Sequence, residues 1–312
     1  MKIAPKLAIV TTLRAPENII QSFVNYHLNI GIDQLFLFFD DPNDPSIIKF
    51  SNHPKITTIK CTNKHWEKTG CHKNSDIETR QTHNADLALS QAKKQGIDWI
   101  THIDIDELIH TEKKNIKEIL STIDQTTAYL WMQTLEAIPT KLETTNPFIE
   151  INNFKIPQKN NTIKQETLSS TLFHNEYFRG HIGGKSFTRT RSDVKSLKIH
   201  RPEPLENHTL TAQTTKETML LHYDCYDYKS WLEKWERRYD GSANFTGREN
   251  RNKQFSEFKN YRKSNNKNDL LKFYKKLYLT PEKIIKQLIK NNYARNINID
   301  KKLFSPPKKN KW

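Results

Sequence analysis

The stretch Trp99 to His110, WITHIDIDELIH, places three acidic side chains within an apolar run. If this run is a β-strand, its side chains alternate between two faces, so Asp104 and Asp106 point the same way. Two carboxylates about 7 Å apart along a strand repel each other unless a positive charge lies nearby, and a divalent cation is a common partner. The alternative is a solvated strand end or a helix N-cap. The spacing makes the pair a candidate metal site.

Two later segments carry further candidates. EYFRGHIGGKSFTRTR, from Glu176 to Arg191, holds three glycines within five residues beside Lys185. A Walker A loop is excluded because Arg179 stands where that motif needs glycine, which leaves a tight basic hairpin or another phosphate-binding loop. MLLHYDCYDYKSWLEKW then brings a histidine and two aspartates, His222, Asp224 and Asp227, between an apolar strand and an aromatic helix. A lone histidine is usually structural, but His222 is a candidate ligand here.

Alternating strands and helices must position these residues. The predicted strands are residues 7–13, 34–41, 55–61, 99–106 and 128–140, and the predicted helices are residues 15–31, 75–96 and 113–124. Pro16 opens the first helix and Gly31 follows its end, whereas Ser75 and Glu78 suggest a capping box for the second. This order predicts βαβ units and a parallel sheet whose ligands bind beyond the carboxyl ends of its strands. The turn TTLRAPEN contains no glycine, which excludes a Rossmann dinucleotide site.

Composition limits the class of protein. The chain has 312 residues and a formal charge of +15, so we expect one large domain, or a domain with an extension, and a polyanionic neighbour. Its three cysteines, Cys61, Cys71 and Cys225, cannot form a complete disulfide set, and the start reads as a strand rather than a signal peptide. With no apolar run long enough to span a bilayer, the expected location is the cytoplasm, with peripheral contact on the inner membrane face as a further option.

In order, LAIVTTLRAPE, DWITHIDIDEL, GGKSFTR and LLHYDCYDYKSWLEKW resemble the family 2-like glycosyltransferases of the GT-A fold, especially the branch related to family 92. The resemblance covers roughly Lys6 to Tyr239. It implies an α/β GT-A catalytic domain over residues 1–240, with a Rossmann-like mixed sheet flanked by helices, followed by a basic helical extension over residues 241–312. It also implies transfer of a sugar, usually a hexose from a UDP-sugar, to a glycan or lipid-linked acceptor, as in cell-surface glycan biosynthesis.

The resemblance further implies residue roles. Asp104 and Asp106 would hold Mn²⁺ or Mg²⁺ against the donor diphosphate, with His222 completing the metal shell. The positions where the family contacts the nucleotide sugar are Thr11, Arg14, Asp41, Arg80, Asp104 and Lys185. The sequence DDPND leaves open which aspartate after the second strand matters.

An inverting enzyme needs a carboxylate that removes the proton of the acceptor hydroxyl. Glu136, near the end of the strand-like run AYLWMQTLEAIPT, is our first candidate for that base and Asp224 is the second. Glu107 is expected to form a salt bridge or to begin a helix.

Other classes of protein remain as alternatives. A haloacid-type phosphatase also uses D-x-D, but it needs threonine or valine where Leu108 stands. A nucleic-acid-binding protein would explain the charge, yet no such module is present, so no nucleic-acid partner is expected. Cys61, His65, Cys71 and His72 could hold zinc, although their spacing is irregular.

The C-terminal part contains two stretches with apolar residues at helical spacing and lysines between them. The apolar positions are Leu270, Phe273, Tyr274 and Leu277, then Ile284, Ile285, Leu288 and Ile289. These faces either pack against the rest of the protein or lie on an anionic membrane.

Overall fold

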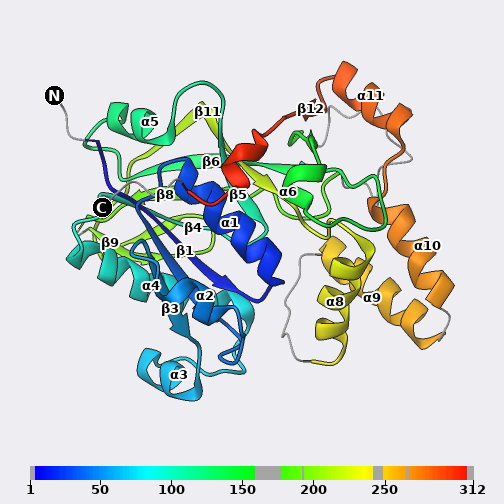
Figure 1. Ribbon diagram of the computed structural model, residues 1–312, viewed down its shortest axis with the longest axis horizontal. Helices are drawn as coiled ribbons and strands as arrows, with labels where there is room; N and C mark the ends of the chain where they lie inside the picture. The colour runs from blue at the N-terminus through cyan, green and yellow to red at the C-terminus, as the bar shows by residue number, and fades with distance from the viewer. Residues whose placement is uncertain (1–3, 159–176, 192, 242–248, 265–266, 308–312) are drawn as a thin grey trace. The chain divides into compact units, whose positions relative to one another are not determined.

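The computed structural model describes residues 4–158, 177–191, 193–241, 249–264 and 267–307 (Figure 1). The chain forms two compact units. The first comprises Met1–Gln133, Gly183–Leu220 and Asp300–Trp312, and the second comprises Thr134–Ile182 and Leu221–Ile299. Residue 240, where we placed a domain boundary, therefore lies inside the second unit.

A mixed sheet forms the centre of the first unit. Its parallel strands β1 (Leu7–Leu13), β2 (Gln34–Phe39), β3 (Ile56–Lys60) and β4 (Trp99–His102) lie in the order β4-β1-β2-β3. Strand β8 (Lys185–Arg189) runs antiparallel to β4 and pairs with the beginning of β6 (Tyr129–Ala137). Every residue of β1 is buried, as expected for a strand covered on both faces. The predicted α/β class with a mixed sheet flanked by helices is confirmed.

The remaining strands of the first unit are short or peripheral. β5 (Glu107–Thr111) pairs with β11 (Ala212–His222), and β9 (Val194–Leu197) forms a separate ribbon with β10 (Pro202–Pro204). The helices are α1 (Glu17–Asn29), α2 (Ile47–Ser51), α3 (Asn63–Thr69), α4 (Ile77–Lys94), α5 (Ile116–Thr122) and the 3₁₀ turn η1 (Lys301–Phe304).

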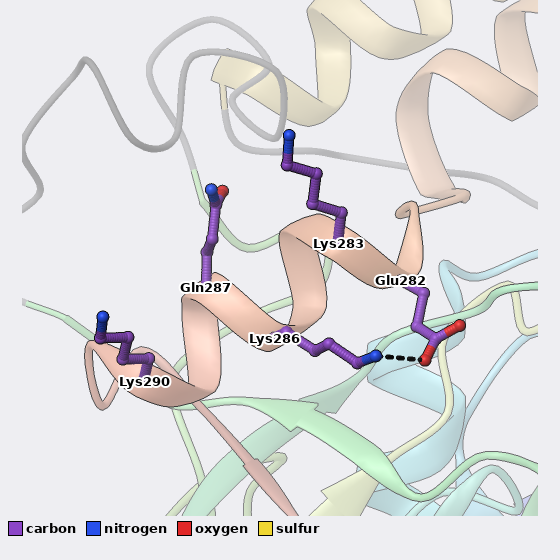
Figure 2. Close-up of a pocket in the computed structure, with 5 residues that line it drawn as sticks. All are labelled: Glu282, Lys283, Lys286, Gln287 and Lys290. Carbon is purple, nitrogen blue, oxygen red and sulfur yellow. Dashed lines mark ion pairs between the residues drawn. The ribbon is translucent and has the colours of Figure 1, made fainter.

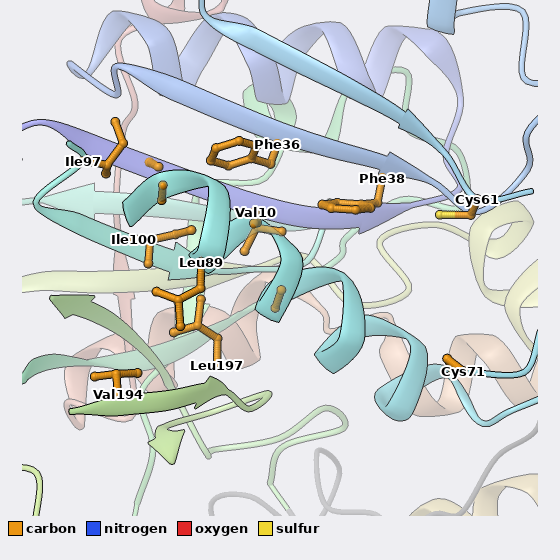
Figure 3. Close-up of a cluster of buried hydrophobic side chains, with 14 of the residues drawn as sticks. Val10, Phe36, Phe38, Cys61, Cys71, Leu89, Ile97, Ile100, Val194 and Leu197 are labelled. Atoms are coloured by element: carbon orange, nitrogen blue, oxygen red, sulfur yellow. The ribbon is translucent and has the colours of Figure 1, made fainter. Parts of the chain in front are cut away.

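Helix α4 covers one face of the sheet. Its small residues Ala85, Ala88 and Ala92 allow close packing on strands β1 and β2, where Val10 and Phe36 are fully buried (Figure 3). Cys61 and Cys71 belong to the same cluster, and all three cysteines are free and buried. The side chains of Cys61 and Cys71 therefore pack as part of this hydrophobic core.

Two local predictions need correction. Helix α4 begins after Asp76, whose carboxylate accepts a hydrogen bond from the Thr79 amide at 2.9 Å, so the predicted Ser75 capping box is wrong. Strand β4 ends at His102, so Asp104 and Asp106 lie in the turn between β4 and β5 and not on a strand face. The pair still follows the carboxyl end of a parallel strand.

Residues near the C-terminus complete the first unit by packing on α1. Asn25 donates a hydrogen bond to the Phe304 carbonyl at 2.8 Å, and the ring of Tyr26 stacks on Phe304 with centroids 5.3 Å apart. Asn29 donates to the Leu303 carbonyl at 2.8 Å. Figure 1 shows this red turn beside the blue helix α1.

The second unit combines a small antiparallel ladder with helices. Strand β7 (Asn153–Lys155) pairs with the end of β6 and with β12 (Ala294–Asn296). The helices are α6 (Pro147–Glu150), α8 (Tyr228–Tyr239), α9 (Glu249–Lys263), α10 (Lys267–Tyr278) and α11 (Glu282–Lys290). Asp227 caps α8 by accepting a hydrogen bond from the Ser230 amide at 2.7 Å, so its role is structural.

The apolar faces of the C-terminal helices pack inside this unit. Phe273 and Tyr274 of α10 are buried against Trp231 and Trp235 of α8, and Ile285 of α11 belongs to a second buried cluster. The packing interpretation of both faces is therefore confirmed. Among the residues that the structure describes, no helix is both long enough and apolar enough to cross a bilayer.

Candidate functional site

Polar residues of the first unit gather at the carboxyl ends of its parallel strands. Thr11 is fully buried within β1, and the exposed Arg14 follows the end of that strand. Asp40 and Asp41 follow β2, and Asp104 follows β4. Because these strands are parallel and adjacent, their polar ends share one edge of the sheet, where open α/β folds bind ligands.

Helix α4 contributes a buried arginine to this edge. Arg80 forms an ion pair with Asp40, and its guanidinium carbon lies 5.9 Å from the centre of the Trp66 ring. Asp41 instead accepts a hydrogen bond from the backbone amide of Asn43 at 3.0 Å. The structure thus joins predicted Arg80 to Asp40, whereas Asp41 remains on the adjoining bend.

The next polar residues of α4 reach the neighbouring strands. Gln81 donates a hydrogen bond to Asp104 Oδ1 at 2.6 Å, and Asn84 donates to Thr12 Oγ1 at 2.9 Å. Asn84 also bonds His65 Nε2 through its own Oδ1 at 2.7 Å. One helix therefore orients groups at the ends of three strands. We did not predict Gln81 or Asn84, although Arg80 and Asn84 extend the i, i+4 series of Ala88 and Ala92 along one helix face.

Lys185 neutralises part of the acidic turn. Its Nζ lies 3.0 Å from Asp104 Oδ2 and 3.5 Å from Glu107 Oε2, and both Lys185 and Glu107 are fully buried. Glu107 also accepts a hydrogen bond from the Asp104 amide at 2.8 Å, which fixes the turn. Burial lowers the pKa of Lys185, but Asp104 and Glu107 outweigh this effect and raise it above its ordinary value. The lysine is therefore a fixed cation, and the expected salt bridge of Glu107 is confirmed.

The glycines before Lys185 permit close packing. A Cβ on Gly184, whose φ is +67°, would lie 2.4 Å from the Met132 carbonyl oxygen, and one on Gly183 would lie 2.8 Å from the His200 ring. The strand that follows, β8, pairs with β4 and β6, and within the described residues 177–191 it forms no hairpin of its own. The hairpin alternative is thus wrong for this part of the chain, and Gly184 allows the backbone to approach β6.

A buried histidine lies next to the acidic turn. Burial and the nearby charge of Lys185 lower the pKa of His102 to about 3, so its imidazole is neutral near pH 7. Asp106, in the same turn, is partly exposed. Negative charge at this turn therefore comes from carboxylates, with one buried ammonium group among them.

The second unit holds the remaining predicted residues. Glu136, the penultimate residue of β6, is buried and accepts hydrogen bonds from Lys155 Nζ at 2.9 Å and from the Gly180 amide at 2.5 Å. His222 ends β11 and is also buried. The proposed metal role of His222 stays a prediction.

Asp224 is held by two cations. Its carboxylate lies 2.6 Å from Lys234 Nζ and 2.8 Å from an Arg251 nitrogen. Burial raises the pKa of Asp224, but Arg251 and Lys234 outweigh it and hold the pKa well below its ordinary value. A carboxylate of such low pKa is a weak base, so the geometry favours an anchoring role for Asp224.

A basic groove of about 400 Å³ lies along α11 (Figure 2). Lys283, Gln287 and Lys290 extend to the same side of the helix, while Lys286 pairs with Glu282 at 3.0 Å. The lysine ammonium groups and the Gln287 amide are groups that bind anions. The carboxylate that lines the groove, Glu282, is ion-paired with Lys286.

Comparison with known proteins identifies a family. The model of glycosyltransferase family 92 matches residues 14–260. Two Arabidopsis thaliana proteins, both named glycosyltransferase-like, are each 23% identical to the chain, over 246 and 250 residues. Each match covers 70% of this chain, but 53% of the first protein and 47% of the second. The chain thus spans about half the length of these curated relatives.

Among solved structures, UDP-glucose pyrophosphorylase complexed with UDP-glucose aligns with 76% of this chain and 99% of its own. The TM-score is 0.31 and the sequence identity is 10%.

Proposed function

The chain belongs to glycosyltransferase family 92, and from this premise we propose that it transfers a sugar from a nucleotide-diphosphate sugar to a hydroxyl group of a glycan or a lipid-linked acceptor. We further propose a metal-dependent, inverting transfer of a hexose, with a UDP-sugar as the first donor to test.

The position of Asp104 carries this proposal. It follows the carboxyl end of β4, and both of its oxygens are oriented by other side chains, Oδ1 by Gln81 and Oδ2 by Lys185. A carboxylate oxygen has two lone pairs, so each can accept one hydrogen bond and still face a ligand. Thr11, Arg14 and Asp41 lie at the same sheet edge and are the proposed contacts to the nucleotide.

The residues of the turn suit a hard divalent cation. Asp104 and Asp106 supply carboxylate oxygens, the ligands that Mg²⁺ and Mn²⁺ favour, and Asp106 is partly exposed. We propose that these two residues hold the ion. When bound, the cation would stabilise the charge of the diphosphate leaving group. Arg80 and Lys185 supply fixed positive charge at this edge.

Calorimetric titration of UDP, with and without Mn²⁺, tests the proposal. Asp104→Asn and Asp106→Asn should each weaken metal-dependent binding at least about tenfold, because an amide loses the charge but keeps nearly the same shape. Asp124→Asn is the matched control, since Asp124 is an exposed turn residue of the same unit that bonds Thr126. Unchanged affinity in both site variants would exclude the metal site.

Activity is tested separately by screening nucleotide sugars for slow hydrolysis without an acceptor. Release of the nucleoside diphosphate that depends on Mn²⁺ and on Asp104 is the expected result. A metal-independent release that survives Asp104→Asn would contradict the mechanism.

Peripheral contact with an anionic membrane is a further proposal, supported by the outward lysines of α11. A variant with Lys283, Lys286 and Lys290 changed to glutamate should no longer pellet with vesicles rich in anionic lipid at low salt. Equal pelleting of the wild type and the variant would count against it.

A further inference from the structure

Residues 177–180 of the second unit are held from several sides. Tyr177 donates a hydrogen bond from its hydroxyl group to the Tyr293 carbonyl at 2.9 Å. Arg179 Nε donates to the Leu277 carbonyl at 2.9 Å, which joins the segment to the end of α10. Tyr177, Phe178 and Arg179 are all buried. The segment is therefore an internal part of its unit.

Glu136 makes the central contacts to this segment. Its Oε2 accepts hydrogen bonds from the amide of Arg179 at 2.8 Å and from the amide of Gly180 at 2.5 Å. Its Oε1 lies 2.9 Å from Lys155 Nζ. Two consecutive amides that point at one carboxylate oxygen fix both the position and the direction of the backbone.

Lys155, on the neighbouring strand β7, is the ion-pair partner of Glu136. The β6–β7 register places it directly opposite Glu136, and its Nζ also donates a hydrogen bond to the Tyr177 carbonyl at 3.0 Å. Glu136 is 2% exposed and Lys155 is 5% exposed. A buried ion pair with further hydrogen bonds holds a rigid geometry, and removing either partner leaves an uncompensated charge.

The fixed backbone lies close to an imidazole. A Cβ on Gly180 would lie 3.0 Å from His222 Cε1 and 3.2 Å from Glu136 Oε2, so the space beside Gly180 is bounded by these two side chains and has little room for a methyl group. The ring of His181 lies beside that of His222, with centroids 5.3 Å apart and planes inclined by 33°. A shift of Gly180 toward His222 would therefore press on that ring, and it would carry the adjoining His181 with it.

We propose that Glu136, together with Lys155, is a positioning residue that fixes the His181–His222 pair for the transfer reaction, and that it is not the general base. This inference rests on the proposed function. Unlike Asp104, Glu136 accepts two hydrogen bonds at each oxygen: Oε1 from Lys155 Nζ and from the Arg179 amide at 3.0 Å, and Oε2 from the amides of Arg179 and Gly180. An acceptor hydroxyl would have to displace one of these buried donors before Glu136 could take its proton.

Three variants of the full chain test the inference. Glu136→Gln and Lys155→Met each remove one partner of the buried Glu136–Lys155 ion pair, and the double variant removes both. Lys253→Met is the control, because it removes an ion-paired but exposed lysine from the same unit. Thermal unfolding identifies any variant that fails to fold, in which case Glu136→Asp, which retains the charge, replaces Glu136→Gln.

The first measurement needs no substrate. Two-dimensional NMR of the imidazole nitrogens should show shifted His181 and His222 signals in Glu136→Gln and in Lys155→Met, but not in Lys253→Met. Deuterium exchange of the amides of residues 179 and 180 should be at least about tenfold faster in the first two variants. Unchanged histidine signals would overturn the positioning role.

The second measurement separates positioning from base catalysis. We expect kcat to fall by about ten- to a hundredfold in both single variants and by no more in the double variant, with the donor KM and the acidic limb of the pH profile retained. If Glu136→Gln abolishes the acidic limb while Lys155→Met keeps normal kcat, Glu136 is the base and the inference is wrong. If the wild type turns over no donor, the proposed function fails, while the NMR result still decides whether Glu136 and Lys155 fix the positions of His181 and His222.

Discussion

Lys185, which is fully buried, and Asp104, which is partly exposed, form an ion pair of 3.0 Å although they lie 81 positions apart in the sequence. The pair joins the beginning of β8 to the turn after β4, and Glu107 shares the same ammonium group. The acidic turn therefore folds around a cation supplied by the chain itself. A second cation at this turn would add to that charge without replacing it.

Lys185→Met should destabilise the first unit by about 3 kcal/mol, because it leaves the buried Glu107 and the partly exposed Asp104 without their ammonium partner. Mn²⁺ should then raise the thermal midpoint of the variant more than that of the wild type, since bound metal would supply part of the missing charge. Differential scanning calorimetry measures both effects, and Lys195→Met, at an exposed pair with Glu203, serves as the control. A variant as stable as the wild type would show that the ion pair contributes little.

The same substitution at Asp40 and at Asp41 should affect different properties, stability at Asp40 and nucleotide binding at Asp41. Asp40→Asn removes the charge partner of buried Arg80 and should lower the free energy of unfolding by about 3 kcal/mol. Asp41→Asn keeps its hydrogen bond to Asn43 and should change stability by less than about 0.5 kcal/mol while weakening nucleotide binding. Urea denaturation and calorimetry give the two quantities. Equal loss of stability in both variants would contradict this division of roles.

Asp224 should make the second unit sensitive to acid. Its pKa is lower in the folded chain than in the unfolded chain, so its contribution is complete above about pH 5 and is lost as pH falls below about 4. Asp224→Asn should cost about 3 kcal/mol at pH 7, because Lys234 and Arg251 lose their partner, and the gap to the wild type should narrow toward pH 3. Denaturation curves from pH 3 to pH 7 measure it. A gap that stays constant over this range would rule out the linkage.

Two neighbouring residues of α10 separate packing from surface charge. Phe273→Ala removes a ring that is 2% exposed in the cluster around Trp231 and should cost about 3–5 kcal/mol. Lys272→Ala, at an exposed position, should change stability by less than about 0.5 kcal/mol. Chemical denaturation followed by tryptophan fluorescence reports on both. A small effect of Phe273→Ala would mean that the helix contributes little to the core.

Local patterns predicted most elements of the first unit. An apolar β-branched run gave β1, and Pro16 and Gly31 marked the ends of α1, because these signals act within a few residues. The strand pattern failed after His102, where the acidic residues form a turn fixed by the Glu107 carboxylate. A side chain that bonds the backbone within three residues competes with the strand ladder, and periodicity alone does not reveal this.

Long-range pairing explains what the sequence could not reveal about the candidate residues. Glu136 was found by its place near the end of a strand, but its partner Lys155 follows from the β6–β7 register, which no local pattern encodes. The choice of Asp40 over Asp41 as partner of Arg80 likewise depends on how β2 ends relative to α4. Spacing can identify a carboxylate, whereas its partner depends on the tertiary fold.

The contact between η1 and α1 has a consequence for synthesis of the chain. The hydrogen bonds from Asn25 and Asn29 cannot form until the carbonyl groups of Phe304 and Leu303 have been synthesised. These two residues leave the ribosome only after all residues of the second unit. The first unit can therefore form its sheet early but gains these contacts last. Nascent chains stalled before residue 300 should leave this side of α1 open to chaperones or proteases until translation passes that point.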